Sequence, residues 1–519
     1  MLINQTLFDM DASVKVLCNT LSLYGKMVIT TIISLYLTRV ILNYLGASDF
    51  GLYNLIGGVI SLLSFVNSAL MVSTQRFLSV ALGENNDTKI KNIFSASILI
   101  HIALSAILII VLELCCTFLF NGFLNIEPDR IHAAKVVYQL MIISTVFTVL
   151  GVPYNAIINA KEDLWLFSLV ETLCAVLKIG IIVIFHYTQS DALITYTLWI
   201  VVITAINFFL KYIWCRAKYN ECRKLTIHMQ RNTSLVKEMI RFSGWNAFGT
   251  LALIGRNQGV AVLLNVFWGT AINAVYGIAN QVNSQLIYFS TMMTTSMTPQ
   301  IMKSYGEGNR MRMLDLSVFT CKLSFFLSAV FAIPLLLELP FILKLWLKNV
   351  PAYTEIFCSL IIYMFLLMQV YPGLNRAIQA CGRIKWYQIF TSFVLLLPIP
   401  LGIAFGRSGG ESYSIIYLMI ISQAIQMCVA IYMAKRLVGL HVMPFVAFII
   451  KAGITFSVIY IGGKYLYQQM SAIYNEWVTF GVVVSTTMLT FSLVYYLFVF
   501  GTKDREKMRN VACAILKRK

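Results

Sequence analysis

The segment Ile98-Leu-Ile-His-Ile-Ala-Leu-Ser-Ala-Ile-Leu-Ile-Ile-Val-Leu112 contains no charged residue, and it decides the fold class. It lies in an apolar run of residues 93–120, and about 20 such residues are enough to cross a bilayer as a helix. The run is continuously apolar rather than alternating, which favours a helix over a strand. Inside a bilayer only helices and closed barrels satisfy their backbone hydrogen bonds. The segment therefore predicts a transmembrane α-helix.

Runs of the same kind recur along the whole chain. Of the 519 residues, 59% are hydrophobic and only 12% are charged, whereas a soluble protein carries about 25% charged residues. We therefore predict an all-α membrane protein with about 14 transmembrane helices. The predicted spans are residues 20–43, 52–80, 93–120, 134–160, 164–187, 192–216, 238–267, 271–301, 313–337, 355–380, 384–406, 412–434, 444–466 and 478–500.

Basic residues are concentrated in alternate connections between these spans. The net charge is +18, and 26 Lys and Arg residues fall in one set of connections against 6 in the opposite set. Since cytoplasmic loops are the basic ones, both termini are predicted to be cytoplasmic. Residues 1–20 lack a small-residue cleavage site, so we expect the first helix to stay in the membrane. The predicted location is the bacterial inner membrane, and the charge is not attributed to nucleic acid.

Two stretches of the chain resemble each other at a constant offset of 223 residues. Gly46 then matches Gly269, Tyr53 matches Tyr276, and Gly83-Glu84-Asn85-Asn86 matches Gly306-Glu307-Gly308-Asn309. Residues 155–160 match residues 375–380 at an offset of 220. Because six helices separate the copies, each copy enters the membrane from the same side. The repeat predicts two pseudo-symmetric six-helix lobes around a cleft, with alternating access between them.

The repeat defines the expected domain organisation. An N-lobe is expected at residues 1–217, a basic cytoplasmic linker at 218–237 and a C-lobe at 238–437. Residues 438–519 are expected to add two further transmembrane helices and a basic cytoplasmic tail. Pro153 and Pro372 lie at corresponding places in the two lobes, and proline disturbs the helix that contains it. They are either paired hinges or prolines of the kind that membrane helices tolerate.

Several ionisable and amide side chains lie inside the predicted spans. A charged side chain in the middle of a bilayer is costly unless it meets water or a partner. Arg256 is the clearest case, and its guanidinium would suit a phosphate or another anion; the alternative is an internal ion pair. The set predicted to bind substrate is Arg256, Asn257, Arg39, Lys26, Arg76 and Asn280. Two alternatives to substrate binding remain. Arg39, Lys26 and Arg76 could snorkel to the membrane surface, and the polar residues could pack between helices.

Glu171 and Lys178 share one face of the fifth predicted helix. They are seven residues apart, about 10 Å along the axis, which is too far for a direct ion pair. We expect them to join a network with other helices or to act in ion coupling, and the first outer loop adds Asp49. The eleven cysteines show no metal-ligand spacing, so no metal and no cofactor are expected. H⁺ and Na⁺ both remain open as coupling ions.

The stretch from Arg39 to Tyr53, which ends Asp49-Phe-Gly-Leu-Tyr53, resembles the first hairpin of a known family. Together with Gln75-Arg76-Phe77 and the loop after Gly83, it is similar to the polysaccharide biosynthesis, or O-antigen, flippases. These belong to the multidrug/oligosaccharidyl-lipid/polysaccharide (MOP) exporter superfamily. The resemblance implies a flippase that moves undecaprenyl-diphosphate-linked oligosaccharide from the cytoplasmic to the periplasmic leaflet, for lipopolysaccharide, O-antigen or capsule synthesis. Membrane lipids, a polysaccharide polymerase and chain-length proteins are the implied partners.

Two other functions fit parts of the sequence. A MATE-type cation-coupled multidrug exporter of the same superfamily is the first, although the early helices lack a mid-span Asp and basic residues outnumber acidic ones inside the spans. A polyprenyl-dependent membrane glycosyltransferase or ligase is the second, with Asp49 as its base. No outer loop is long enough to bind an acceptor glycan, so we do not expect an enzyme.

Overall fold

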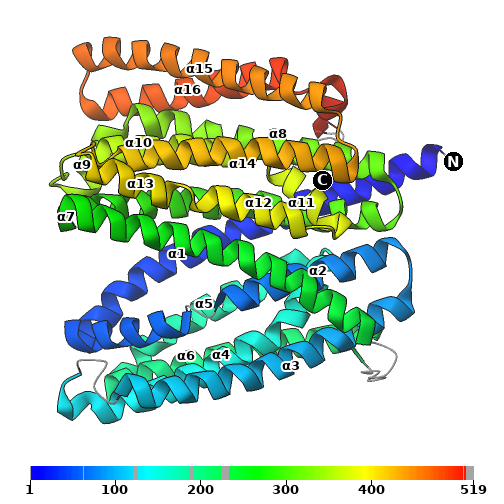
Figure 1. The fold of residues 1–519 in the computed structure, drawn as a ribbon, viewed down its shortest axis with the longest axis vertical. Coiled ribbons are helices and arrows are strands. Elements are labelled where there is room, and N and C mark those ends of the chain that lie inside the picture. Colours follow the sequence, from blue (N-terminus) through cyan, green and yellow to red (C-terminus); the bar gives the residue numbers. More distant parts are fainter. Residues whose placement is uncertain are drawn as a thin grey trace. The chain divides into compact units, whose positions relative to one another are not determined.

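The structure is a computed structural model, and it describes residues 2–61, 64–120, 126–187, 191–223, 233–506 and 508–509. These residues are almost entirely helical, and none of them forms a strand. The chain divides into two compact units, which Figure 1 shows in sequence colours. We call Cys18–Ala247 the N-terminal unit, and Phe248–Lys519 with Met1–Leu17 the C-terminal unit. Part of the expected linker (224–232) and most of the expected basic tail (507 and 510–519) lie outside the described residues.

The N-terminal unit is built around α4, which contacts α2, α3, α5 and α6. Its core includes the fully buried Val137 and Tyr138 of α4. The elements are α1 (Leu2–Ser61), α2 (Ser64–Gly83), α3 (Asp87–Phe118), the short 3-10 turn η2 (Pro128–Arg130), α4 (Ile131–Ala160), α5 (Leu164–Tyr187), α6 (Ala192–Lys218) and the 3-10 turn η3 (Asn220–Cys222). The start of α7 (Thr233–Gly306) also belongs to this unit, because the boundary falls between Ala247 and Phe248 inside that helix.

The C-terminal unit is built around α8 and α14. Beyond the rest of α7 it contains α8 (Arg310–Leu337), α9 (Leu339–Leu347), α10 (Thr354–Met368), α11 (Pro372–Cys381), α12 (Lys385–Leu396), α13 (Pro398–Arg407), α14 (Ser414–Val438), α15 (Val442–Ile473) and α16 (Glu476–Phe498). In Figure 1 the last two helices lie side by side, and both contact α8. Lys322 of α8 pairs with Asp504 beyond α16 at 2.6 Å, and the Tyr495 hydroxyl donates to the Lys322 carbonyl oxygen at 2.9 Å.

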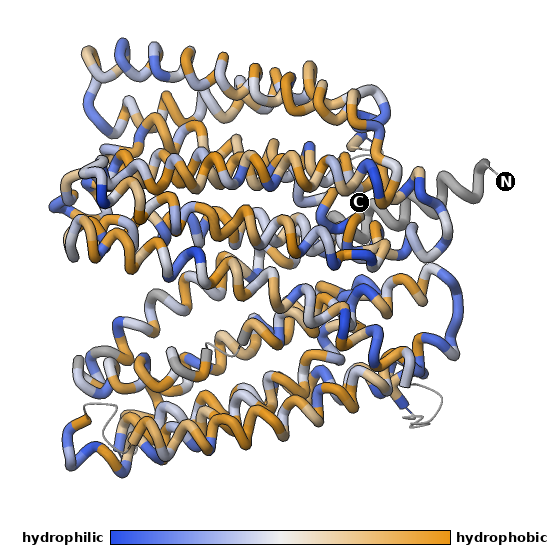
Figure 2. Tube along the Cα trace, viewed as in Figure 1, coloured by the Kyte–Doolittle hydropathy of each residue, from blue (hydrophilic) through white to orange (hydrophobic). Residues whose placement is uncertain are grey.

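The membrane-spanning character of the fold is confirmed. Among the described residues, 11 helices are long and apolar enough to cross a bilayer, and the bent pair α10 and α11 makes a twelfth span. The 74-residue α7 is counted once, yet an unbroken helix of that length would measure about 111 Å against a hydrocarbon core of about 30 Å. It covers two of the predicted spans, 238–267 and 271–301, and its backbone breaks between them at Gly269. The predicted span 52–80 is not among the helices that are apolar enough. Figure 2 shows hydrophobic residues along the helices and hydrophilic ones gathered mainly near their ends.

Two glycines break the long helices at equivalent places in the repeat. Gly46 interrupts α1 with φ 74° and ψ 173°, and Gly269 interrupts α7 with φ 85° and ψ 178°. This backbone region is essentially restricted to glycine. The two residues are the pair that the 223-residue offset aligns. The sequence repeat thus corresponds to a repeated backbone conformation.

The loops that follow α2 and α7 make corresponding contacts in the two copies. Asn86 caps α3 by accepting a hydrogen bond from the backbone of Lys89 at 2.9 Å, and Asn309 caps α8 by accepting from Arg312 at 3.0 Å. Glu84 pairs with Lys89, and Glu307 pairs with Arg312. Asparagine is among the best helix N-caps, which explains why this position is the same in both copies. The two pseudo-symmetric halves predicted from the sequence are confirmed.

The two prolines behave differently. The chain bends by 44° between α10 and α11, and Pro372 occupies the first turn of α11. Pro153, in contrast, lies buried inside α4, which is continuous from Ile131 to Ala160. A proline is accommodated in a first turn because its missing N–H would be unpaired there anyway. The helix break is therefore found in one half only.

Candidate functional site

A cluster of buried polar residues surrounds Arg256 in the C-terminal unit. Arg256 is only 3% exposed. Its Nε and Nη2 atoms donate to the side-chain oxygen of Asn257 at 3.1 and 2.9 Å, and its other electrostatic neighbours are Tyr276 and Tyr371. It forms no ion pair with any acidic residue that the structure describes. A buried guanidinium held only by neutral groups has capacity for an anionic or strongly polar ligand.

A second arginine belongs to the same polar region. Arg376 of α11 donates to the Gln379 side chain at 2.9 Å and interacts with Tyr387. Tyr387 in turn interacts with Tyr371, which links Arg376 to the surroundings of Arg256. We call Arg256, Asn257, Tyr371, Arg376 and Tyr387 the arginine cluster. Its residues come from α7, α11 and α12 and from the turn that precedes α11.

The sequence analysis named two of these five residues, Arg256 and Asn257. Asn280, which was predicted together with Arg256 and Asn257, interacts with Tyr276, which is an electrostatic neighbour of Arg256. Arg376 was not assigned a role, although it lies in the repeated segment 375–380. The sequence did contain a signal for Arg376, because it is a basic residue within the repeat and lies four residues after Pro372.

Lys26 and Glu171 meet in the N-terminal unit, together with a lysine that the sequence did not single out. Lys211 of α6 is 1% exposed and pairs with Glu171 of α5 at 2.7 Å. Asn207 donates to the same Glu171 oxygen at 3.1 Å. The ammonium groups of Lys26 and Lys211 lie 4.6 and 4.7 Å from the ring centre of Phe167. We call these five residues the lysine cluster; Lys211 is paired with Glu171, and Lys26 interacts electrostatically with the same carboxylate.

Lys178 and Arg39 were also predicted as site residues. Both side chains are exposed, and neither forms an ion pair with a residue that the structure describes. Glu171 therefore finds its partner on the neighbouring helix α6 and not on its own helix. The seven-residue spacing of Glu171 and Lys178 explains why they do not pair.

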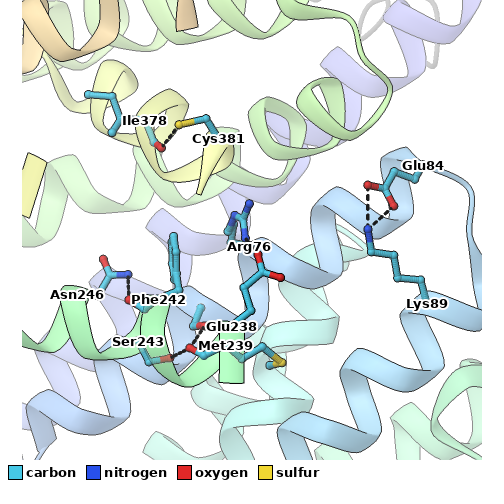
Figure 3. A network of polar contacts seen from close by, with 11 residues as sticks. Arg76, Glu84, Lys89, Glu238, Met239, Phe242, Ser243, Asn246, Ile378 and Cys381 are labelled. Carbon is cyan, nitrogen blue, oxygen red and sulfur yellow. Dashed lines mark hydrogen bonds and ion pairs between the residues drawn. The ribbon is translucent and has the colours of Figure 1, made fainter. Parts of the chain in front are cut away.

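Arg76 joins α2 to the beginning of α7. Its guanidinium lies 4.5 Å from the Phe77 ring centre and 5.1 Å from that of Phe242, and it approaches Glu238 at 3.9 Å. Figure 3 shows this contact, with the α7 residues Glu238 and Phe242 facing Arg76 of α2. Stacking of a guanidinium on aromatic rings stabilises such a contact. These contacts hold α2 against the beginning of α7, which is a structural role.

Asp49 takes part in an ion-pair network at the end of the N-terminal unit where α4 and α6 begin. Arg130 donates to Asp49 through Nε at 2.9 Å and to Asp191 through Nη1 at 2.6 Å. Asp191 also caps α6, accepting from the backbone of Leu193 and Ile194. Burial raises the pKa of Asp191, but the Ile194 N–H and the Arg130 guanidinium outweigh it, so this pKa lies below its ordinary value. The network connects three helices.

Metal chemistry finds no support among the described residues. No group of three or more His, Cys, Asp or Glu side chains there could hold a metal ion. The buried cysteines Cys215, Cys321 and Cys358 are free, and Cys358 lies in the apolar core of the C-terminal unit as a small hydrophobic residue would.

Comparison with known proteins identifies the family. The MatE family model matches residues 23–185 and 258–404, which together are more than half of the chain and fall in both halves of the repeat. No curated protein sequence gives a significant match.

Solved structures share the fold at low sequence identity. The crystal structure of MATE in the bent conformation aligns with a TM-score of 0.72 at 14% identity, over 82% of this chain and 97% of that one. The structure of MATE in the straight conformation aligns with a TM-score of 0.70 at 14% identity, over 82% and 96%. A MOP superfamily transporter from Pyrococcus furiosus, described as having a binding pocket of reverse polarity, aligns with a TM-score of 0.66 at 14% identity, over 82% and 95%.

These findings correct the functional expectation drawn from the Arg39–Tyr53 hairpin. The O-antigen flippase resemblance, with its undecaprenyl-diphosphate oligosaccharide substrate and role in lipopolysaccharide synthesis, was wrong, because the matching family model is MatE. In the structure, Gly46 of this hairpin forms the break in α1 and Asp49 pairs with Arg130, so both have structural roles. MatE proteins are transporters and not enzymes. The chain is a multi-pass membrane transporter that belongs to the MatE family.

Proposed function

We propose that this chain is a MATE-type multidrug exporter, a secondary transporter that moves amphipathic small molecules by alternating access. The observation that carries the proposal is the match of the MatE model to both halves of the chain. Two repeated halves are the architecture from which alternating access arises in many transporters. The glycine breaks at Gly46 and Gly269, which occur in both halves, support the same mechanism.

The proposed location is the bacterial inner membrane, with both termini in the cytoplasm. Support comes from the 26 basic residues in one set of connections against 6 in the other, because positive charge is retained on the cytoplasmic side. In this orientation the compounds would leave the cell from the cytoplasm or the inner leaflet.

The arginine cluster is the proposed contact for the polar group of the exported compound. Arg256 and Arg376 have neutral hydrogen-bond acceptors in Asn257 and Gln379, so an acidic group of a ligand would add the charge that these partners lack. The reverse pocket polarity described for the Pyrococcus furiosus transporter supports the idea that this fold accepts different ligand charges. We therefore expect exported compounds to include amphiphiles that bear an acidic group.

The lysine cluster is the proposed place of ion coupling, with H⁺ as the coupling ion. Glu171 already accepts from the Lys211 ammonium and the Asn207 amide. Alkali and alkaline-earth cations are held by several oxygen ligands, whereas the described groups around Glu171 are nitrogen donors. A proton can still be exchanged among Lys26, Lys211 and Glu171, since two basic groups share one acid.

Drug accumulation in cells tests the proposal. The chain is expressed in a bacterial strain that lacks its own multidrug exporters, and the accumulation of fluorescent cationic and anionic dyes is compared with the empty vector. We expect lower accumulation of at least the anionic dyes, abolished when the proton gradient is collapsed. If the protein is present in the membrane and no dye is accumulated less, the proposal is wrong.

A further inference from the structure

Glu338 is a buried acidic residue at the junction of α8 and α9, and neither cluster described above includes it. The residue is only 1% exposed. Its backbone N–H donates to the Pro334 carbonyl oxygen at 3.0 Å, and its carbonyl oxygen accepts from the Ile342 N–H at 2.9 Å. The first bond belongs to the end of α8 and the second to the start of α9, so Glu338 is fixed where one helix passes into the other.

The carboxyl group of Glu338 lacks a partner among the described residues. Its Oε1 atom is buried and has no hydrogen-bond partner there, and no Lys, Arg or His that the structure describes forms an ion pair with it. A carboxylate buried without partners is so costly in its ionised form that such a group takes up a proton instead. Burial accordingly raises the pKa of Glu338 above its ordinary value.

The charged groups on the helices packed against α8 do not compensate this residue. α8 contacts α9, α10, α15 and α16, and α9 lies at the end of the C-terminal unit where α15 turns into α16 (Figure 1). Lys344 of α9 pairs with Glu476 of α16 at 3.4 Å. Tyr467 of α15 has Glu338, Glu355 and Glu476 as its electrostatic neighbours, all of them acidic. The remaining charged side chains of these helices near the junction are exposed, namely Lys348, Glu355 and Lys464.

Apolar contacts hold α9 in place directly after Glu338. Leu339 and Leu343 are each 1% exposed, and both belong to the core cluster that includes the fully buried Phe357 of α10. A charge on Glu338 would require water around the carboxylate. Water can reach this group only where the packing of α9 against its neighbours opens.

We propose that Glu338 is a proton-binding site and that its bound proton keeps α9 packed against α8 and α10. When the proton leaves to the solvent at higher pH, the carboxylate becomes hydrated and α9 loosens from the core. In the orientation proposed above, this end of the C-terminal unit faces the periplasm, so the site would respond to external pH. The proton site itself requires neither that orientation nor transport activity.

Thermal unfolding of the purified full-length protein at two pH values tests this assignment. The folded carboxyl group holds its proton more tightly than the unfolded one, so its stabilising effect is present at low pH and is lost as the pH rises through the folded pKa. Glu338→Gln keeps a neutral group of the same shape at every pH. The variant should therefore unfold at the wild-type temperature near pH 5 and about 2 °C higher than the wild type at about pH 8.

Glu355→Gln is the matched control, because Glu355 is an exposed carboxyl group on α10 near the same junction. It should keep the pH dependence of the wild type. Hydrogen–deuterium exchange follows α9 itself, and the variant and wild type are compared at one pH so that the intrinsic effect of pH on exchange cancels. At about pH 8 the amides of residues 339–347 should exchange faster in the wild type than in Glu338→Gln, and near pH 5 the two should be equal.

The outcomes are distinguishable. Equal pH dependence of the wild type and Glu338→Gln, or the same change in Glu355→Gln as in Glu338→Gln, would overturn the assignment. Glu338→Met, which is also neutral and of similar size, replaces Glu338→Gln if that variant does not fold. The wild type provides an independent readout, because the absence near pH 5 of an infrared band from a buried neutral carboxyl group would also overturn the proposal. Since these measurements concern stability and protonation, a failed export assay would leave them unaffected.

Discussion

Gly46 and Gly269 hold a backbone conformation that other residues avoid. Both have positive φ, and a Cβ at either position would meet no atom within 4 Å. Space is therefore not the constraint, and any cost of substitution comes from the backbone alone. Such conformations cost about 1–3 kcal/mol in a residue other than glycine.

We expect Gly269→Ala to lower the stability of the purified protein by about 1–3 kcal/mol, measured as the midpoint of thermal unfolding. Gly277→Ala is the matched control, because Gly277 lies in the same helix, also with open space around it, and without a positive φ. Alanine is favoured over glycine inside a helix, so the control should be unchanged or slightly more stable. Equal effects of the two substitutions would show that the break at Gly269 does not depend on glycine.

The charge of Asp191 leads to a second prediction, about how stability depends on pH. Its pKa is lower in the folded protein than its ordinary value, so its contribution to stability is present above about pH 4 and is lost as the pH falls through the folded pKa. Asp191→Asn keeps a good N-cap but removes the charge that Arg130 binds. The variant should be less stable at pH 7 by about 1 kcal/mol, and this difference should be smaller at pH 3, below the ordinary pKa of Asp.

Thermal unfolding of the wild type and Asp191→Asn at both pH values provides the check. Arg130 remains charged throughout this range, so the change reports the carboxyl group. A difference between the two proteins that is the same at pH 7 and pH 3 would contradict the assignment.

At the scale of the helix, the bend between α10 and α11 is fixed by a close approach of two backbones. Gly373 follows Pro372, and a Cβ on Gly373 would collide with the backbone carbonyl oxygen of Ser317 on α8. A backbone atom cannot rotate away as a side chain can. Pro372 therefore sits at a bend that is packed in place against α8.

Gly373→Ala should destabilise the C-terminal unit by about 1–3 kcal/mol, the usual cost of overpacking. Gly453→Ala on α15 is the control, because open space surrounds that position. Unfolding of both variants is followed in detergent by tryptophan fluorescence. If Gly373→Ala were as stable as the control, α8 and α11 would have to be further apart than the structure shows.

Helices could be predicted wherever the sequence has a regular pattern. Long apolar runs predicted the helices. The 223-residue offset aligned Gly46 with Gly269 and Asn86 with Asn309, although the sequence predicted neither the breaks nor the caps that these residues form. The pairing of Glu171 with Lys211 depends on how α5 and α6 pack, which the sequence pattern does not contain. The chain bends at Pro372, whereas helix α4 is continuous at Pro153. The sequence did not predict this difference, because it depends on the surrounding helices and not on the proline alone.

At the scale of the whole molecule, sequence patterns predicted the fold but not the family. The doubled architecture is common to transporters with different cargo, so it does not select a substrate. The family resemblance depended on the hairpin from Arg39 to Tyr53, which contains Gly46, Asp49 and Gly51. In the structure, Gly46 forms the break in α1, and Asp49 forms an ion pair with Arg130. These roles are structural and contain no information about the exported compound.

The central claim is that a MatE transporter moves an amphiphile whose polar group contacts Arg256. The most direct measurement is uptake of an anionic dye into proteoliposomes that contain the purified protein and carry an imposed pH gradient. The wild type should move the dye, and Arg256→Gln should slow this by about tenfold or more, since a hydrogen bond to a charged group contributes about 1.5–3 kcal/mol. Arg383→Gln, an exposed arginine of the same unit, should transport at the wild-type rate. Normal transport by Arg256→Gln, or no gradient-dependent transport by the wild type, would contradict the account.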